Sequence, residues 1–485
     1  MTQAGYLSDV PYPPHFQREM TPLWLAQAAT ALGRRAPPAE RSFHWLELGC
    51  GSGLSAAVVA ACHPQARCTA VDVGAAHIAS AHALAHLARL PNLAPVQADV
   101  LVLADGPDEA LAPCDFIVLH GMYAWISPAH RAAVVRIAAR WLKPGGLLYV
   151  GYMSAPGAAL LAPVRALMQA HARQGQGNSA ARARAALDFV RQLARDGLLA
   201  ARPELAGQLE RMAAESDAYL AHEFLAPHAE ALPVARVTAD FEAAGCEWIG
   251  SATLTDNVDA LSLPAAVQPH LRGLRDPVLA ETVRDLARHQ SLRRDIFQRP
   301  LPDGAHRLPP DEHRMQLLAQ AVSAVPGAPT GGALVYDSRI GPIEGAAALF
   351  EPLLAALAQG PQTFGGLAAL PAFARQPGIL SQALQLLYQA GWGHPLRRDA
   401  VDALPAWRLN RLLLGLAQDA PLPFAPPGWL VAPLLGTALP LDEDVRQHVV
   451  QALSAPTEHT REDRTLAAWA AVGALPRAGY TSRIA

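Results

Sequence analysis

The segment richest in chemical information spans residues 47–53 and has the sequence ELGCGSG. It follows an apolar run at 43–46 that predicts a strand, and it leads into a helix-compatible stretch at 54–60. Glycines in such a turn allow a sharp change in backbone direction and let a ligand approach without a Cβ in its way. The segment therefore predicts a binding site for a nucleotide-type cofactor.

The spacing of the three glycines indicates which cofactor to expect. Gly49, Gly51 and Gly53 give G-x-G-x-G, whereas a dinucleotide fingerprint would need glycine or alanine where Leu54 stands. Glu47 lies two positions before the first glycine, where its carboxylate can hold an ammonium group. S-adenosylmethionine (AdoMet) carries an ammonium and a carboxylate at its methionine end, and it therefore suits this turn.

Strands and helices alternate beyond the turn, which predicts an α/β fold with a doubly wound, Rossmann-like sheet. Ligands of such sheets bind at the carboxyl ends of the parallel strands. Five strands are predicted, at 43–46, 67–73, 94–100, 114–120 and 147–153.

Polar side chains fall at the ends of these predicted strands. Asp72 ends the second strand, where a carboxylate can accept hydrogen bonds from both hydroxyls of a ribose. Asp99 lies near the end of the third strand, within reach of an adenine amino group. Val73 and Val100 follow these acids and are predicted cofactor contacts, and His120 ends the fourth strand.

This set of landmarks resembles the class I AdoMet-dependent methyltransferases. The carrying residues are E-x-G-x-G-x-G, Asp72, and the K-P-G-G turn at 143–146. A narrower resemblance is to bacterial methyltransferases with a "methyltransferase regulatory domain", a group that includes rickettsial protein-lysine methyltransferases. It rests on five places: Tyr6, 10–13, 149–157, 219–225 and 293–297. The resemblance implies AdoMet as cofactor, a protein lysine as leading acceptor, and a homodimer by analogy. Met153 and Ala158 depart from it, since asparagine and tryptophan are expected there.

Methyl transfer to an amine constrains the acceptor pocket. A lysine amine has a pKa of about 10.4 in water and must lose its proton before it attacks. Burial against aromatic rings lowers that pKa, and the rings also stabilise the cationic product. Tyr12, Tyr123 and Tyr152 are the aromatic candidates for a catalytic role, although a core role for each stays open. His120 is a candidate base or ribose contact, and further pocket candidates are Trp125, His222 and Glu223.

Other functions remain as alternatives or are disfavoured. The fourth strand ends in H-G-M-Y rather than the N/D-P-P-Y signature of enzymes that methylate amino groups of nucleic acid bases or glutamine. The formal net charge of −3 supplies no field that would draw in nucleic acid or anionic lipid. A small-molecule methyltransferase of secondary metabolism and a non-catalytic AdoMet-binding regulator stay open as alternatives.

Composition bounds the compartment and the metal content. The five cysteines form no C-x-x-C pair and predict reduced thiols in a cytoplasmic protein. No signal peptide and no apolar run of membrane-spanning length is recognisable. His77, His82 and His86 lie near one another on a predicted helix, but no further ligand is in view, so no metal is predicted.

The chain is predicted to have a helical insertion and a mostly α-helical C-terminal half. A helix is expected from about 263 to 297, and a short strand at 246–250. Helices in 345–400 resemble a winged-helix module, although no wing strands are recognisable, and simple helix packing is the alternative. The expected units are a cap at 1–41, an AdoMet-binding core at 42–158, a helical insertion at 159–214, a regulatory-type region at 215–300 whose start completes the core, a helical region at 301–400 and a C-terminal helical region at 401–485.

Overall fold

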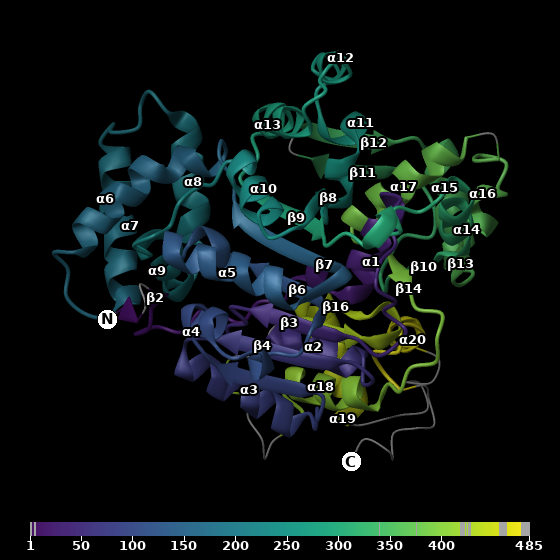
Figure 1. Ribbon diagram of the computed structural model, residues 1–485, viewed down its shortest axis with the longest axis horizontal. Coiled ribbons are helices and arrows are strands. Elements are labelled where there is room, and N and C mark those ends of the chain that lie inside the picture. The colour runs from purple at the N-terminus through teal and green to yellow at the C-terminus, as the bar shows by residue number, and fades with distance from the viewer. Residues whose placement is uncertain are drawn as a thin grey trace.

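A seven-stranded mixed sheet runs through the centre of the molecule in the order β5-β4-β3-β6-β7-β9-β8. The computed structural model (Figure 1) describes residues 2–3, 6–338, 340–374, 376–417, 422, 424, 428–454 and 463–476. The strands are β3 (His44–Leu48), β4 (Arg67–Asp72), β5 (Leu93–Gln97), β6 (Cys114–His120), β7 (Leu142–Met153), β8 (Glu247–Ser251) and β9 (Leu292–Gln298). The first five are mutually parallel, which confirms the predicted doubly wound α/β sheet.

Successive residues of the inner strands point to opposite faces of the sheet, and both faces are buried. One face contributes Trp45, Ala70, Phe116, Val118 and Tyr149 to a hydrophobic cluster. The other contributes Leu46, Val71, Ile117, Leu119 and Val150 to a second cluster. A sheet that is apolar on both faces must be covered by helices on both, as in other parallel sheets.

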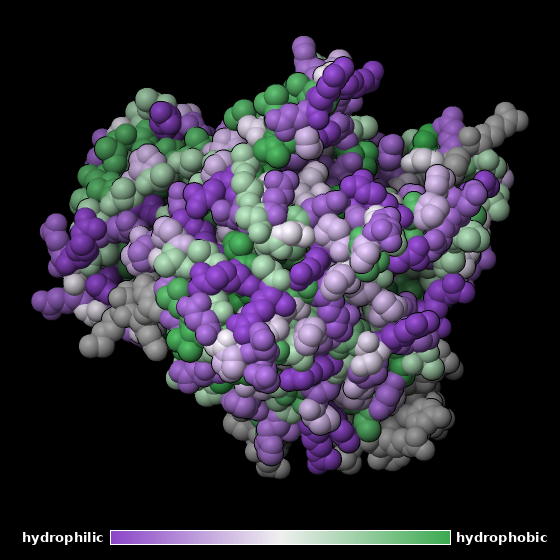
Figure 2. Space-filling model, viewed as in Figure 1, coloured by the Kyte–Doolittle hydropathy of each residue, from purple (hydrophilic) through white to green (hydrophobic). Residues whose placement is uncertain are grey.

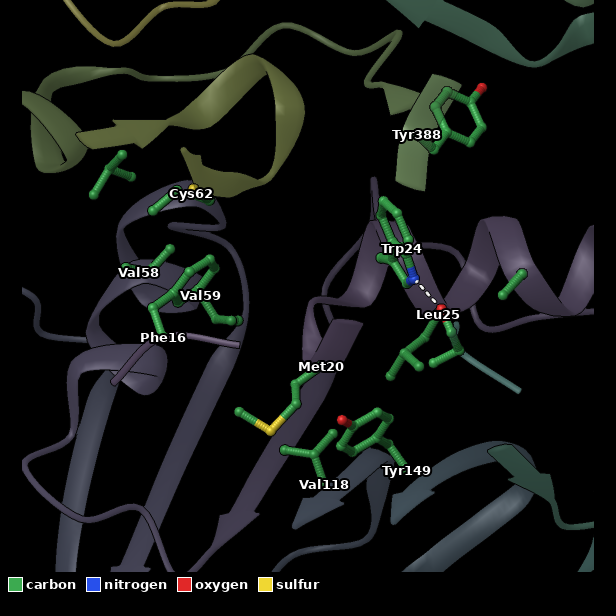
Figure 3. Packing of buried hydrophobic residues seen from close by; sticks show 14 of the residues in the cluster. Phe16, Met20, Trp24, Leu25, Val58, Val59, Cys62, Val118, Tyr149 and Tyr388 are labelled. Carbon is green, nitrogen blue, oxygen red and sulfur yellow. Dashed lines mark hydrogen bonds between the residues drawn. The ribbon is translucent and has the colours of Figure 1, made fainter. Parts of the chain in front are cut away.

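Helices from the N-terminal part of the chain cover the two faces. The first face is covered by α1 (Pro22–Ala31), α2 (Leu54–Cys62) and α3 (Ala75–Leu87), and the second by α4 (Val100–Asp105), α5 (Pro128–Trp141) and α10 (Val234–Glu242). Figure 3 shows how the N-terminal segment seals the first face. Met20 lies beside Val118 and Tyr149, and the indole of Trp24 donates a hydrogen bond to the carbonyl of Ala252 over 2.8 Å.

The strand β9 corrects the predicted helix at 263–297. Only α13 (Pro277–Arg288) and two four-residue helices, α11 (Asp259–Ser262) and α12 (Gln268–Leu271), form in that stretch. Residues 292–298 instead lie between β7 and β8, antiparallel to both. The charged Arg293 and Asp295 are buried in this strand because they pair with each other. Their charges gave the segment a polar character that concealed a central strand.

Four helices form a separate unit with its own hydrophobic cluster at the left of Figure 1. They are α6 (Ala162–Ala172), α7 (Ser179–Arg195), α8 (Pro203–Ala213) and α9 (Asp217–Leu225). The packing of α9 against α7 ties the predicted insertion to the segment that follows it. Hydrophobic residues gather on the outside of this unit at the left of Figure 2. Leu198, between α7 and α8, is 55% exposed.

The C-terminal half contains strands that the sequence analysis missed. A three-stranded antiparallel sheet, β13-β10-β14, lies beside the helices of 345–400. Its strands are only two to four residues long, too short to give an alternating pattern: β10 (Ala321–Ala324), β13 (Gln362–Thr363) and β14 (Gly393–Leu396). The helices of this half are α14 (Pro310–Ala319), α15 (Ala347–Ala358), α16 (Phe364–Ala368), α17 (Pro377–Gln389), α18 (Leu404–Leu413), α19 (Glu443–Ser454) and α20 (Arg464–Ala471).

Two hairpins complete this half, and its last part packs on α2. The hairpins are β11 (Leu334–Ser338) with β12 (Gly341–Gly345), and β15 (Trp429–Ala432) with β16 (Thr437–Pro440). Arg397 reaches the end of α2, where it donates hydrogen bonds to the carbonyl of Cys62 and to the ring of His63. The C-terminal half therefore binds the end of α2, the helix that follows the glycine turn. Within the described part of the chain, every helix is too short or too polar to span a bilayer.

Candidate functional site

A cavity of about 580 Å³ opens at the carboxyl ends of β3, β4 and β6. Its walls also include the N-terminal segment at 12–20 and residues 215–223 around α9. Eleven of the residues predicted from the sequence line it: Tyr12, Glu47, Gly49, Gly51, Asp72, Val73, Asp99, Val100, His120, Trp125 and Glu223. The parallel sheet brings these residues together from distant parts of the sequence because the strand ends share one edge.

The three glycines of the turn have different tasks. All three have positive φ, at 73° for Gly49, 53° for Gly51 and 78° for Gly53, a region that side chains with a Cβ rarely adopt. A Cβ on Gly51 would meet nothing within 4 Å, so this edge of the turn is open to a ligand. A Cβ on Gly53 would lie 2.5 Å from the Cβ of Ala81, so Gly53 allows α2 to pack on α3 and does not itself line the cavity.

Asp72 fixes the shape of the turn. Its two carboxylate oxygens accept hydrogen bonds from the amides of Gly51 over 2.9 Å and Gly74 over 2.8 Å. The ring of His77 lies 3.1 Å from the same carboxylate and accepts a hydrogen bond from the amide of Tyr12 over 3.0 Å. Asp72 therefore connects the N-terminal segment to the glycine turn. The sequence analysis considered His77 only as a metal ligand, and this link was missed because it joins residues 65 positions apart.

Glu47 is a buried carboxylate with one oxygen, Oε2, that has no hydrogen-bond partner among the described residues. Burial raises the pKa of Glu47 well above its usual value, and the negative charge of Asp72 adds to this. An ionised, buried carboxylate of this kind is unfavourable in the protein without ligand, and it gains a partner when a ligand cation binds beside it. A ligand ammonium beside Glu47 at the cavity wall fits this requirement.

Asp99 lies two residues beyond β5, rather than inside a strand as predicted. It is the N-cap of α4 and accepts a hydrogen bond from the amide of Leu101 over 2.9 Å. Its carboxylate also lies 3.3 Å from Nε2 of His130. The cap holds the carboxylate of Asp99 at the cavity wall, between Ala98 and Val100.

Another part of the cavity wall combines aromatic rings with acids. The ring of Tyr12 lies 5.6 Å from that of Trp125 and 6.3 Å from that of Tyr219. Glu215 and Glu223 line the same end. Glu223 is enclosed by protein atoms but keeps some contact with the cavity, and burial raises its pKa to about 7 although Arg165 opposes the shift.

Besides Gly53, three predicted site residues do not line the cavity. Tyr123 and Tyr152 are fully buried, and their hydroxyls donate to Asp240 and Asp295 over 2.8 and 2.7 Å. These rings belong to the core on the second face of the sheet, where each hydroxyl already has an acceptor. His222 hydrogen-bonds to the carbonyl of Val10, and its ring contacts that of Tyr12 edge-on at 5.3 Å. His222 therefore packs against the ring of Tyr12 and helps to fix its position.

Several lining residues were not predicted as site residues. Tyr219 and Arg294 occur in segments that the resemblance had singled out, but nothing in the sequence placed them at the cavity. Glu215 gave no sequence signal, because it lies in a turn before α9. In the described ranges, no cluster of three or more His, Cys, Asp or Glu residues could hold a metal ion.

Comparisons with known proteins agree with this geometry. Residues 46–146 match a methyltransferase domain, and residues 216–299 match a predicted methyltransferase regulatory domain. Both β8 and β9 lie within the second range, so this region shares the main sheet.

Proteins similar in sequence include one from a cyanobacterium and one methyltransferase. The uncharacterised protein sll1526 of Synechocystis is 34% identical over 407 residues, which cover 82% of this chain and 78% of that protein. A trans-aconitate 2-methyltransferase of Paracidovorax citrulli is 34% identical over 113 residues, which cover 23% of this chain and 40% of that enzyme.

The fold is also that of a solved structure. PKMT2 from Rickettsia typhi, also solved in complex with AdoHcy, is similar with a TM-score of 0.66 and 16% identity, over 91% of this chain and 92% of that chain. The glycine turn and its acids thus lie in a shared methyltransferase architecture. The chain belongs to the AdoMet-dependent methyltransferases that carry a methyltransferase regulatory domain.

Proposed function

We propose that this methyltransferase transfers the methyl group of AdoMet to the side-chain amine of lysine in a protein substrate. The observation that carries the proposal is the pairing of neighbouring aromatic rings with two acids on the cavity wall. A cationic, unbranched side chain is the ligand that such a site attracts, through its carboxylates and through cation–π contact with the rings.

The part of the cavity around the glycine turn suits AdoMet. Glu47 would hold the ammonium, Asp72 the ribose hydroxyls and Asp99 the adenine amino group, while the open edge at Gly51 leaves room for the cofactor. AdoMet supplies a methyl group on a sulfonium, which is a good leaving group. The tasks left to the protein are to hold the acceptor in line and to remove a proton from it. Orientation alone can lower the barrier by about 7–11 kcal/mol in favourable cases.

The part of the cavity wall that carries the aromatic rings and the two acids can bind a lysine side chain and then remove its proton. Glu215 and Glu223 attract the ammonium form, and Tyr12, Trp125 and Tyr219 surround it with rings. Enclosure by rings lowers the pKa of the amine, and Glu223, with a pKa of about 7, is able to take the proton and pass it to water. The neutral amine then attacks the methyl carbon as the bond from carbon to sulfur breaks, and the product is a methylated ammonium.

The resemblance to rickettsial protein-lysine methyltransferases supports the same acceptor. A homodimer and a cytoplasmic location stay predictions, which sedimentation and cell fractionation can test.

Labelled AdoMet separates the proposal from its two alternatives. We expect tritium from methyl-labelled AdoMet to enter protease-sensitive material of a cell lysate and to appear as methyl-lysine after acid hydrolysis. The Asp72→Ala variant is the negative control. Label found only in small molecules would favour a small-molecule methyltransferase. AdoMet binding without any transfer would favour a regulator.

A further inference from the structure

Three side chains from neighbouring strands lie together beside the cavity. The guanidinium of Arg294 on β9 lies near the hydroxyl of Tyr149 on β7, and its Nη1 donates to the hydroxyl of Thr253 over 3.2 Å. That hydroxyl lies 2.8 Å from Nδ1 of His120 on β6, and the two rings are nearly parallel, with an angle of 20° between them. Gly151 leaves room for this arrangement, because a Cβ there would lie 2.3 Å from Nδ1 of His120.

The surroundings of the Tyr149 hydroxyl set the direction of its hydrogen bond to His120. The hydroxyl carries one proton, and within the described residues Nδ1 of His120 is the acceptor that lies at hydrogen-bond distance from it. The nearby positive charge of Arg294 favours the orientation in which this proton points away from the guanidinium and toward His120. Nδ1 of His120 must then be the acceptor, which leaves the ring proton on Nε2. Burial lowers the pKa of His120 to about 3, and the nearby charges of Arg294 and His15 act in the same direction. The ring is therefore neutral at physiological pH.

The order of the strands in the sheet indicates which group of a bound cofactor the Nε2–H of His120 would face. Asp72, assigned to the ribose, ends β4, and Glu47, assigned to the ammonium, lies on β3. The strand next to β3 on the other side is β6, which ends in His120. The carboxylate of AdoMet is bonded to the same carbon as the ammonium, so an ammonium held by Glu47 would leave the carboxylate within reach of this neighbouring strand. Arg294, the only Lys or Arg among the described residues that line the cavity, adds positive potential on this side.

We propose that Arg294 and Tyr149 are positioning residues that hold His120 as an Nε2–H donor, and that this donor binds the carboxylate of AdoMet instead of acting as a base. The identity of the ligand rests on the proposed function, whereas the direction of the hydrogen bonds does not. His120 therefore has no role in removing the acceptor's proton.

Nitrogen-15 NMR of histidine-labelled protein without cofactor tests the direction of the hydrogen bonds. The His120→Gln difference spectrum identifies the signals of His120. We expect the neutral Nε2–H form at every pH between 6 and 8. An Nδ1–H form, or protonation of the ring in this range, would overturn the proposal. This measurement is independent of methyl transfer, so an inactive protein does not affect it.

Calorimetric titration with AdoMet tests the ligand. Tyr149→Phe removes the proton directed at Nδ1, and we expect it to weaken AdoMet binding about tenfold, which corresponds to about 1.4 kcal/mol. Tyr388→Phe is the matched control, because that buried hydroxyl has no hydrogen-bond partner among the described residues, and its affinity is expected to be unchanged.

Two changes at His120 itself separate donation from packing. His120→Gln keeps an N–H near the position of Nε2 and is expected to retain the affinity within about threefold, whereas His120→Leu is expected to lose about tenfold or more. Equal losses in both variants, with unchanged melting temperatures, would overturn the role as a donor. Wild-type protein that binds no AdoMet would instead refute the proposed function.

Discussion

Replacing Glu47 with glutamine should weaken cofactor binding and stabilise the empty protein at the same time. The carboxylate is buried beside Asp72, and its Oε2 atom has no hydrogen-bond partner among the described residues. Glutamine has almost the same shape but carries no charge. Affinity and stability change in opposite directions because the buried charge of Glu47 is unfavourable without ligand, whereas the ammonium of the ligand needs that charge as its partner.

The loss of affinity follows from one missing charge-assisted hydrogen bond. Such a bond to an ammonium contributes about 1.5–3 kcal/mol, so the dissociation constant of AdoMet should rise about 10- to 150-fold. An ammonium beside Glu47 also favours the ionised carboxylate, so binding should release a proton from the wild-type protein. The glutamine variant has no proton to release at this position.

The stability effect depends on pH. Because the pKa of Glu47 is raised in the folded state, the folded protein holds its proton more tightly than the unfolded chain does. The wild type therefore loses stability as pH rises above the ordinary glutamate pKa of about 4.3, and Glu47→Gln does not. We expect the two proteins to have similar stability at pH 4 and the variant to be more stable at pH 7.

Calorimetry in two buffers of different ionisation enthalpy measures both the affinity and the released proton, and urea unfolding at pH 4 and pH 7 measures the stability. Glu281→Gln is the matched control, since Glu281 is equally buried but pairs with Arg293 and Arg284 over 2.9 Å. That change should lower stability and leave AdoMet affinity unaltered. Unchanged affinity in Glu47→Gln would refute the assignment of Glu47 to the ammonium.

Three further predictions concern the packing at Gly53, the role of Glu223 in binding the methyl acceptor, and the buried charge of Arg293. Gly53→Ala should destabilise the protein by about 2–4 kcal/mol in urea unfolding, because it combines positive φ with a Cβ placed 2.5 Å from that of Ala81. For a lysine peptide, KM should fall as pH rises through about 7 while Glu223 ionises; Glu223→Gln should raise KM and abolish this dependence, and an unchanged profile would exclude the role of Glu223. Arg293→Met should destabilise the fold by about 3–5 kcal/mol, since it leaves the carboxylates of Asp295 and its neighbours buried without their cation; a melting temperature equal to that of wild type would contradict this.

The sequence by itself determined the five parallel strands of the sheet and the part of the site around the glycine turn. Glycine spacing, a strand before it and acids at the ends of the next two strands are local signals, because each depends on neighbouring residues and on the fixed geometry of parallel strands. The five parallel strands, the turn at Gly51 and the approach of Glu47 to Asp72 were all predictable for this reason.

Only the tertiary structure decided which aromatic and charged residues face the cavity. Tyr123 and Tyr12 have the same side chain, yet the first is held in the core by Asp240 and the second lies at the cavity wall. The sequence analysis missed the strand β9 because the strand carries charged residues. These charges can be buried because partners on α13 neutralise them, and a linear pattern does not reveal such partners. Long-range pairing of this kind depends on which segments meet in space, and that is settled by packing of the whole chain rather than by local periodicity.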